Sequence, residues 1–269
     1  MENFVKSKIK NGDAALGIRI VESKTLGVLK ILADSGIDWV FIDCEHGSYD
    51  METVLNLARY SNSIGLCPVI KAPQLNYQLI SRPLDQGAMG VIIPLIESAE
   101  QARDAVRFVR YPPTGERGCG LDNDYSGWKS GAREYLEWAN ENILLILQIE
   151  SRTAIENIDE IAKVKGVDVL FMGPLDLSIS LGVPGEVNHP LIVESIEKVA
   201  EACKQNGVVF GFPGSVENAA KWFKCGARFL CLGSDTTILA EGCREKIKSF
   251  RRSRGYGIGR QSSNSNRSR

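Results

Sequence analysis

The sequence predicts an α/β protein folded as a single (β/α)8 barrel of the TIM type. Eight short apolar runs alternate with eight stretches of helical spacing, a pattern typical of parallel strands joined by helices. No G-x-G-x-x-G motif follows the first run, which argues against an open dinucleotide-binding sheet. The length of 269 residues also suits one such barrel, which typically has about 250 residues.

The predicted strands are mainly apolar runs of four to seven residues, the clearest being ILLILQI at 143–149. In chain order they cover 15–21, 38–43, 67–71, 90–94, 143–149, 167–172, 208–211 and 229–232. The predicted helices show apolar residues at helical spacing, and several are followed by a capping glycine such as Gly36, Gly65 or Gly207. They cover 25–35, 51–64, 77–86, 99–110, 153–164, 191–206, 216–225 and 237–250. The long segment 111–131 is expected to be a functional loop.

Charge and composition limit the domain organisation and the partners. Residues 251–269 contain six Arg and no acid, so this basic tail is expected to be disordered and residues 1–250 to form one domain. Without the tail, the formal net charge changes from −1 to −7, which argues against nucleic-acid binding. No segment has the ~20 apolar residues that span a membrane, and seven cysteines without a C-x-x-C pair favour the cytoplasm.

Two carboxylates lie just beyond predicted strands. Glu150 follows the fifth strand and Asp176 lies shortly after the sixth, so both are expected at the C-terminal face of the barrel, where barrel enzymes carry their reactive groups. Hard oxygen ligands of this kind suit Mg²⁺, Mn²⁺ or Co²⁺. The alternative interpretation is that Asp176 caps a helix and Glu150 is a solvated acid.

Other polar residues end the first three strands: Arg19, then Asp43 with His46, then Lys71. His46 lies three residues after Asp43, whose carboxylate would orient it as a base near neutral pH; a structural histidine in a tight turn is the alternative. Lys71 is open to three interpretations, which are an anion clamp, a Schiff-base nucleophile and a surface lysine. Glu45 is interpreted as a solvated or helix-facing acid.

Five motifs in this order resemble the HpcH/HpaI aldolase family, also called the citrate-lyase-β-like or class II pyruvate aldolase family. The segments are GIDWVFIDCEHG (36–47), LDQGA (84–88), RYPPTGERG (110–118), QIE (148–150) and GPLDLS (173–178). The likeness extends over about residues 5–250. It implies a (β/α)8 barrel whose C-terminal helix is exchanged between subunits, in a hexamer built from dimers.

The resemblance also implies roles for individual residues. Glu150 and Asp176 would ligate the divalent metal, and His46, paired with Asp43, would serve the proton transfers. Asp85 would reach into the site of a neighbouring subunit. The pocket would be lined by Gln148 and by the turn 173–176, with Gly173 and Leu175, which would hold the carboxylate of the keto acid.

The function implied is a metal-dependent carbon–carbon lyase that cleaves or forms 4-hydroxy-2-oxo acids, with an aldehyde as second substrate, through a metal-stabilised pyruvate enolate. Lys71 departs from the family, whose aldolases usually carry Arg there, and Arg19 is a candidate for supplying the missing guanidinium. The alternative is an oxaloacetate-using condensing or decarboxylating enzyme, favoured by Lys71 and by the acidic segment 120–125. A lyase acting on CoA thioesters and a non-catalytic keto-acid binder are weaker alternatives.

Overall fold

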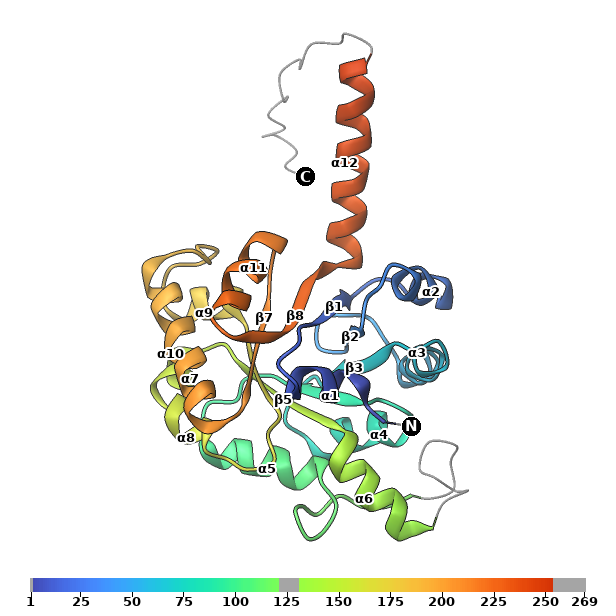
Figure 1. Ribbon diagram of the computed structural model, residues 1–269, viewed down its shortest axis with the longest axis vertical. Helices are drawn as coiled ribbons and strands as arrows, with labels where there is room; N and C mark the ends of the chain where they lie inside the picture. The colour runs from blue at the N-terminus through green and yellow to red at the C-terminus, as the bar shows by residue number, and fades with distance from the viewer. Residues whose placement is uncertain (1, 121–130, 254–269) are drawn as a thin grey trace, which may run out of the picture.

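The computed structural model describes residues 2–120 and 131–253, and its centre is a closed barrel of eight parallel strands in sequential order (Figure 1). The strands are β1 (Ala15–Ile20), β2 (Trp39–Asp43), β3 (Cys67–Lys71), β4 (Gly90–Ile93), β5 (Leu144–Ile149), β6 (Val169–Met172), β7 (Val209–Pro213) and β8 (Ala227–Ser234). The predicted (β/α)8 barrel and all eight of its strands are therefore confirmed.

Helices surround the barrel (Figure 1). They are α1 (Phe4–Lys10), α2 (Leu26–Asp34), α3 (Met51–Ser63), α4 (Tyr77–Asp85), α5 (Ala99–Val109), α6 (Ala132–Asn142), α7 (Arg152–Glu156), α8 (Ile158–Ala162), α9 (Pro174–Ser180), α10 (Pro190–Asn206), α11 (Val216–Lys224) and α12 (Asp235–Ser253). The sequence missed α1, α6 and α9. The prediction of a single helix at 153–164 is wrong. The helix is interrupted at Asn157, whose side-chain amide donates to the Glu97 carbonyl.

The barrel interior is filled by aliphatic side chains and a cluster of aromatic rings. Trp39 stacks on Phe229 with ring centroids 3.8 Å apart and meets the Phe171 ring edge-on at 6.4 Å. A Cβ at Gly17 would lie 2.2 Å from the Trp39 ring, so glycine makes room on β1 for the indole. The interior is a packed core, as expected of such barrels, so reactive groups are expected at the ends of the strands.

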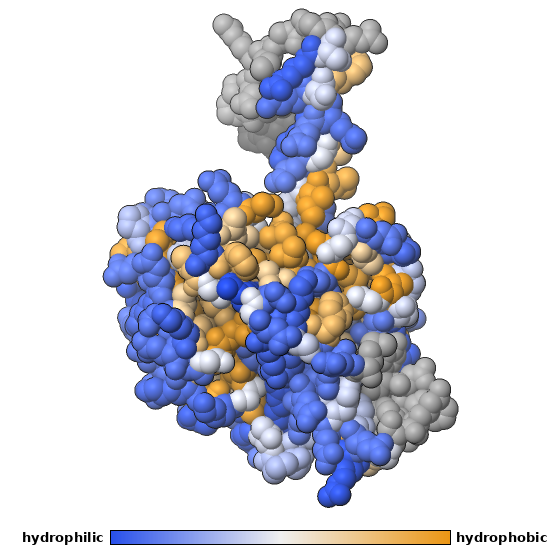
Figure 2. Space-filling model, viewed as in Figure 1, coloured by the Kyte–Doolittle hydropathy of each residue, from blue (hydrophilic) through white to orange (hydrophobic). Residues whose placement is uncertain are grey.

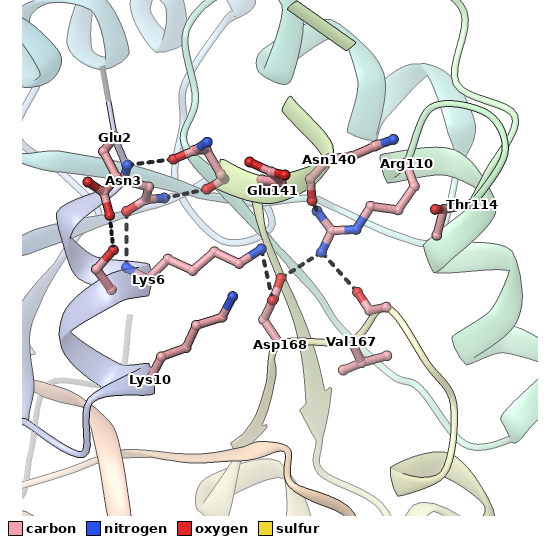
Figure 3. A pocket seen from close by; sticks show the side chains of 13 residues that line it. Glu2, Asn3, Lys6, Lys10, Arg110, Thr114, Asn140, Glu141, Val167 and Asp168 are labelled. Carbon is pink, nitrogen blue, oxygen red and sulfur yellow. Dashed lines mark hydrogen bonds and ion pairs between the residues drawn. The ribbon is translucent and has the colours of Figure 1, made fainter. Parts of the chain in front are cut away.

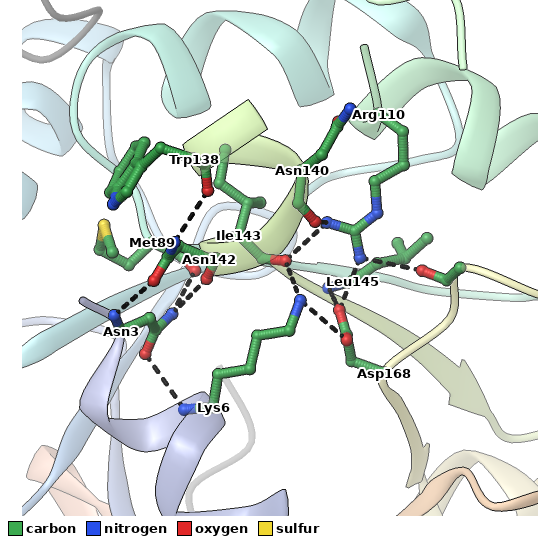
Figure 4. A network of polar contacts seen from close by, with 11 residues as sticks. Asn3, Lys6, Met89, Arg110, Trp138, Asn140, Asn142, Ile143, Leu145 and Asp168 are labelled. Atoms are coloured by element: carbon green, nitrogen blue, oxygen red, sulfur yellow. Dashed lines mark hydrogen bonds and ion pairs between the residues drawn. The ribbon is translucent and has the colours of Figure 1, made fainter. Parts of the chain in front are cut away.

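The N-terminal ends of the strands are closed by α1 and a network of buried ion pairs (Figures 3 and 4). Lys6 of α1 lies 2.9 Å from Asp168 Oδ1 and donates to the Ile143 carbonyl. Arg110 pairs with the other oxygen of Asp168 at 2.6 Å, and this oxygen also accepts the Leu145 N–H. A hollow of about 650 Å³ lies beside this network. Because Lys6 and Arg110 are both paired with Asp168, we assign this network a role in the stability of the fold.

The last helix leaves the body of the protein. Figure 1 shows α12 projecting away from the barrel, and none of its residues is buried. Ile238 and Leu239 lie exposed near its base, where Figure 2 shows apolar surface. Exchange of this helix between subunits stays a prediction, as do the domain limits, and residues 254–269 of the basic tail lie outside the described chain. Within the described chain, no helix combines the length and apolar character needed to cross a lipid bilayer.

Candidate active site

A pocket of about 520 Å³ opens at the C-terminal ends of the strands. Its lining includes seven of the ten predicted site residues: Arg19, His46, Lys71, Gln148, Gly173, Leu175 and Asp176. The residues come from strands and loops on both sides of the barrel, which the closed sheet brings together. The end of β8 adds Gly233 and Ser234, which the sequence analysis did not select.

Glu150 lies directly after β5 and is only 3% exposed. Its Oε1 accepts the N–H of Leu95 at 2.9 Å, and its Oε2 accepts a short hydrogen bond from Gln148 Nε2. Leu95 has a φ of 55°, a strained conformation for a residue with a side chain. Strain at this position directs a backbone donor at the carboxylate and fixes its orientation.

The surroundings of Glu150 move its pKa towards neutral pH. Burial raises the pKa of Glu150 from its ordinary 4.5 to about 7, against the opposing effects of the Lys71 charge and the Leu95 N–H. The negative charges of Asp176 and Glu45 raise this pKa further. Glu150 directly follows β5 and Asp176 lies in the first turn of the helix after β6, so both carboxylates lie at the C-terminal ends of their strands.

Gly173 leaves the space in which these groups meet. A Cβ at this position would lie 2.5 Å from Glu150 Oε2 and 2.8 Å from Gln148 Nε2. The residue directly follows β6. Its carbonyl accepts the Leu177 N–H in the first turn of α9, and Asp176 lies in that same turn. The short helix missed by the sequence thus brings Asp176 to the strand end.

The loop after β2 carries a second cluster of charges. Lys71, which is 4% exposed, forms an ion pair with Glu45, and Glu45 Oε2 also lies 3.4 Å from His46 Nε2. The interpretation of Glu45 as a solvated or helix-facing acid is therefore wrong. The sequence analysis selected the neighbouring His46 but not Glu45 as a site residue. No local sequence pattern indicates that Glu45 pairs with Lys71, because the lysine lies on another strand.

Asp43 does not pair with the imidazole of His46 as expected. Its Oδ1 accepts the backbone N–H groups of Glu45 and His46, each at 3.0 Å, and its Oδ2 accepts Arg19 Nε at 2.7 Å. A tight turn after β2 directs these two N–H groups back towards the strand end and leaves the His46 side chain beyond reach. Arg19 is thereby bound to Asp43, which limits its freedom to replace a guanidinium at Lys71.

Asp85 does not line the pocket of its own chain. It ends α4, which leads towards the beginning of β4, and it pairs with Arg117 at 2.6 Å. The guanidinium of Arg117 is buried and lies 4.7 Å from the Tyr111 ring centroid. A role for Asp85 in a neighbouring subunit's site stays a prediction.

The donors at the pocket suit a hard divalent cation. Among the described residues, Arg19 and Lys71 are paired with Asp43 and Glu45, and no ion pair with a cation compensates Glu150 or Asp176. Gln148 Oε1 is buried without a hydrogen-bond partner. No group of three or more Cys, His, Asp or Glu in the described ranges has metal-binding geometry. A cation held by Glu150 and Asp176 alone would keep coordination positions for water or substrate.

The fold and the pocket together define an enzyme of the (β/α)8 class with an acidic centre at its C-terminal face. Residues 21–242 match the family model described as HpcH/HpaI aldolase/citrate lyase. The chain belongs to this family, and the predicted carbon–carbon lyase class is confirmed.

Individual relatives cover nearly the whole chain. The 2-keto-3-deoxy-L-rhamnonate aldolase of Escherichia coli (strain K12) is 33% identical over 255 residues, covering 93% of this chain and 94% of the relative. The crystal structure of the HpcH/HpaI aldolase from Desulfitobacterium hafniense DCB-2 superposes with a TM-score of 0.86 at 32% identity, covering 91% of this chain and 96% of the other. That of citrate synthase SbnG gives a TM-score of 0.84 at 28% identity, with coverages of 92% and 97%.

Proposed function

We propose that this protein is a metal-dependent aldolase that cleaves or forms 4-hydroxy-2-oxo acids through a pyruvate enolate, with Glu150 and Asp176 holding Mg²⁺, Mn²⁺ or Co²⁺. The observation that carries the proposal is the buried carboxylate of Glu150, whose pKa is raised in part by the charge of Asp176 and which forms no ion pair with a cation among the described residues. A buried, uncompensated acid is costly, and a divalent cation would remove that cost. When bound, the ion would supply Lewis-acid stabilisation of negative charge on a keto-acid oxygen.

The surrounding residues would stabilise negative charge, transfer a proton and bind the keto acid. Lys71 places an ammonium in the pocket where negative charge develops on the oxygen of the keto acid. His46, whose ring is half exposed at the pocket rim, takes the proton from the aldol hydroxyl and returns it in the synthetic direction. Gln148, Gly173 and Leu175 line the space for the keto acid and its carboxylate.

We also propose that the active form is a homo-oligomer, a dimer or a hexamer built from dimers. Two features of one chain support this proposal: α12 has no buried residue, and Asp85 lies outside the chain's own pocket. Exchange of α12 would cover apolar residues such as Ile247 and Phe250, which are 51% and 60% exposed. Asp85 would then serve the site of a neighbour.

A second candidate function is the condensation or decarboxylation of oxaloacetate. Lys71 favours it, because a single ammonium recognises an oxyanion differently from the planar fork of Arg. The structural likeness to citrate synthase SbnG also supports this candidate.

The test is exchange of pyruvate methyl protons in D₂O, followed by NMR, with Mg²⁺, Mn²⁺ or Co²⁺ against EDTA. We expect exchange that requires a metal and is abolished in Glu150→Gln, whereas Glu160→Gln, at an exposed acid of α8, retains it. Absence of exchange with every metal would exclude the pyruvate aldolase and direct the search to oxaloacetate.

A further inference from the structure

Lys71 lies beside Asp43 in the barrel wall, because the two residues are register partners on β3 and β2. Its side chain is 5% exposed, and Glu45 is its ion-pair partner among the described residues. A lysine carries one charge on a flexible stem with four carbons, whereas an arginine presents a rigid planar fork. The direction of the Lys71 ammonium therefore depends on the group that holds it.

The loop that carries Glu45 is fixed by the end of β2. The Glu45 N–H donates to the fully buried carboxylate of Asp43, and the Gly47 N–H donates to the Asp43 carbonyl at 3.1 Å. A Cβ at Gly47 would lie 2.3 Å from that carbonyl oxygen, so the turn requires glycine. Glu45 thus extends from a rigid turn, and its carboxylate has a defined place.

The same carboxylate oxygen meets two groups that line the pocket. Glu45 Oε2 pairs with Lys71 and lies 3.4 Å from His46 Nε2. Glu45 itself does not line the pocket and is only slightly exposed. Any effect of Glu45 on a bound keto acid would therefore pass through Lys71 and His46 rather than through direct contact.

We propose that Glu45 is a positioning residue that directs the Lys71 ammonium towards the keto-acid oxygen while holding His46 at the rim of the pocket. The inference rests on the proposed enolate chemistry. It also explains how lysine works at a position where the resemblance leads one to expect arginine: the neighbouring carboxylate supplies the orientation that a guanidinium fork has by itself.

A double-mutant cycle on metal-dependent pyruvate exchange tests this inference, with the variants Glu45→Ala, Lys71→Met and the two combined. We expect Lys71→Met to lower kcat about 100-fold, in the range for loss of one oriented donor. Glu45→Ala should lower kcat less, about 30-fold, because the Lys71 ammonium remains but is no longer held in one direction. KM should change less than about threefold, because the ammonium matters most as charge develops on the oxygen. Adding Glu45→Ala to Lys71→Met should then cost less than about threefold more.

Two further variants separate positioning from a structural role. Glu45→Gln keeps an acceptor oxygen and the side-chain shape, so its kcat should lie between those of wild type and Glu45→Ala. Glu22→Ala removes an exposed acid from the loop after β1 at the same face of the barrel and should leave kcat unchanged. Equal losses from Glu45→Ala in the wild-type and Lys71→Met backgrounds would overturn the inference, as would a loss confined to unfolding temperature.

The binding of oxalate, a mimic of the enolate, distinguishes failure of this inference from failure of the proposed function. If wild type binds oxalate with Mn²⁺ but does not exchange pyruvate protons, the proposed reaction is wrong. The double-mutant cycle of Glu45→Ala and Lys71→Met is then repeated with the Kd of oxalate as the measured quantity. Non-additive losses in Kd, with Glu45→Ala silent beside Lys71→Met, would still support positioning. Additive losses, or the absence of Mn²⁺-dependent oxalate binding by wild type, would overturn it.

Discussion

Replacing Gly173 by alanine should disable the pocket by steric displacement. The added Cβ would lie 2.5 Å from Glu150 Oε2, where ordinary contacts begin at 3.4 Å, so the carboxylate must move by about 0.9 Å. The Cβ of Glu150 itself would lie only 2.6 Å away, which prevents relief by side-chain rotation alone. Gly173 has a φ of −115°, which alanine tolerates, so the effect is not one of backbone strain.

The magnitude follows from that displacement. Overpacking a buried site costs about 1–3 kcal/mol of stability, and misplacing a catalytic group by about 1 Å costs on the order of 10²-fold in rate. Disturbing the surroundings of a metal ligand lowers affinity about 10–100-fold. We therefore expect Gly173→Ala to weaken Mn²⁺ binding at least ~10-fold and to slow pyruvate exchange ~100-fold.

The assays are calorimetric titration with Mn²⁺, the exchange experiment and urea unfolding. Gly27→Ala is the matched control, because Gly27 lies exposed on α2 with no atom within 4 Å of the added Cβ, and it should stabilise the fold by about 0.4–1 kcal/mol. Wild-type Mn²⁺ affinity and exchange rate in Gly173→Ala would refute the reasoning that Gly173 sets the position of Glu150.

Three further predictions concern charge. Lys71→Met should raise the pKa of Glu150 above about 7, because Lys71 lowers it, and titrations over pH 5–9 should show Mn²⁺ binding develop at higher pH than in wild type. Asp168→Asn should destabilise the fold by about 3–5 kcal/mol in urea unfolding, since two buried cations lose a partner; a loss no larger than that in the exposed pair variant Glu160→Gln would contradict this. Burial lowers the pKa of Lys6 from 10.5 to about 8. Between these pH values the unfolded chain binds more protons than the folded chain, so the free energy of unfolding should rise as the pH increases from 8 to 10.5. Lys6→Met should lack this rise in urea unfolding.

The sequence was sufficient to predict the barrel because its strands are buried on both faces. Such strands appear as continuous apolar runs that are easily recognised, and β5 with LLILQI is the clearest. The helices α1 and α9 have only seven residues each, too few for a helical repeat to stand out. Their positions depend on tertiary contacts, such as those of Lys6 with Asp168.

The site was predictable where a strand end alone determines the position of a side chain. Lys71 and Gln148 line the pocket for this reason, and the buried Glu150 lies beside Gln148. The pairing of side chains was not predictable in the same way. Asp43 accepts the backbone N–H of His46 instead of pairing with its ring. Glu45, in the loop after β2, pairs with Lys71 at the end of β3. Both contacts depend on the tight turn after β2, which has no simple sequence signal.

Two acids with little solvent exposure near the ends of strands show how partners distinguish stability from chemistry. Asp168, just before β6, pairs with Lys6 and Arg110 and accepts the Leu145 N–H. Glu150, just after β5, receives two neutral hydrogen bonds and no ion pair with a cation among the described residues.

Both acids lie beside apolar runs, so hydrophobic patterning cannot separate them. A carboxylate supplied with two cations has its burial cost offset within the chain and anchors the fold. A carboxylate left with neutral donors has a raised pKa and remains able to bind a cation from outside. The lack of an ion pair with a cation at the buried Glu150, rather than the presence of acids, is therefore the feature that supports the proposed cation site at the C-terminal face.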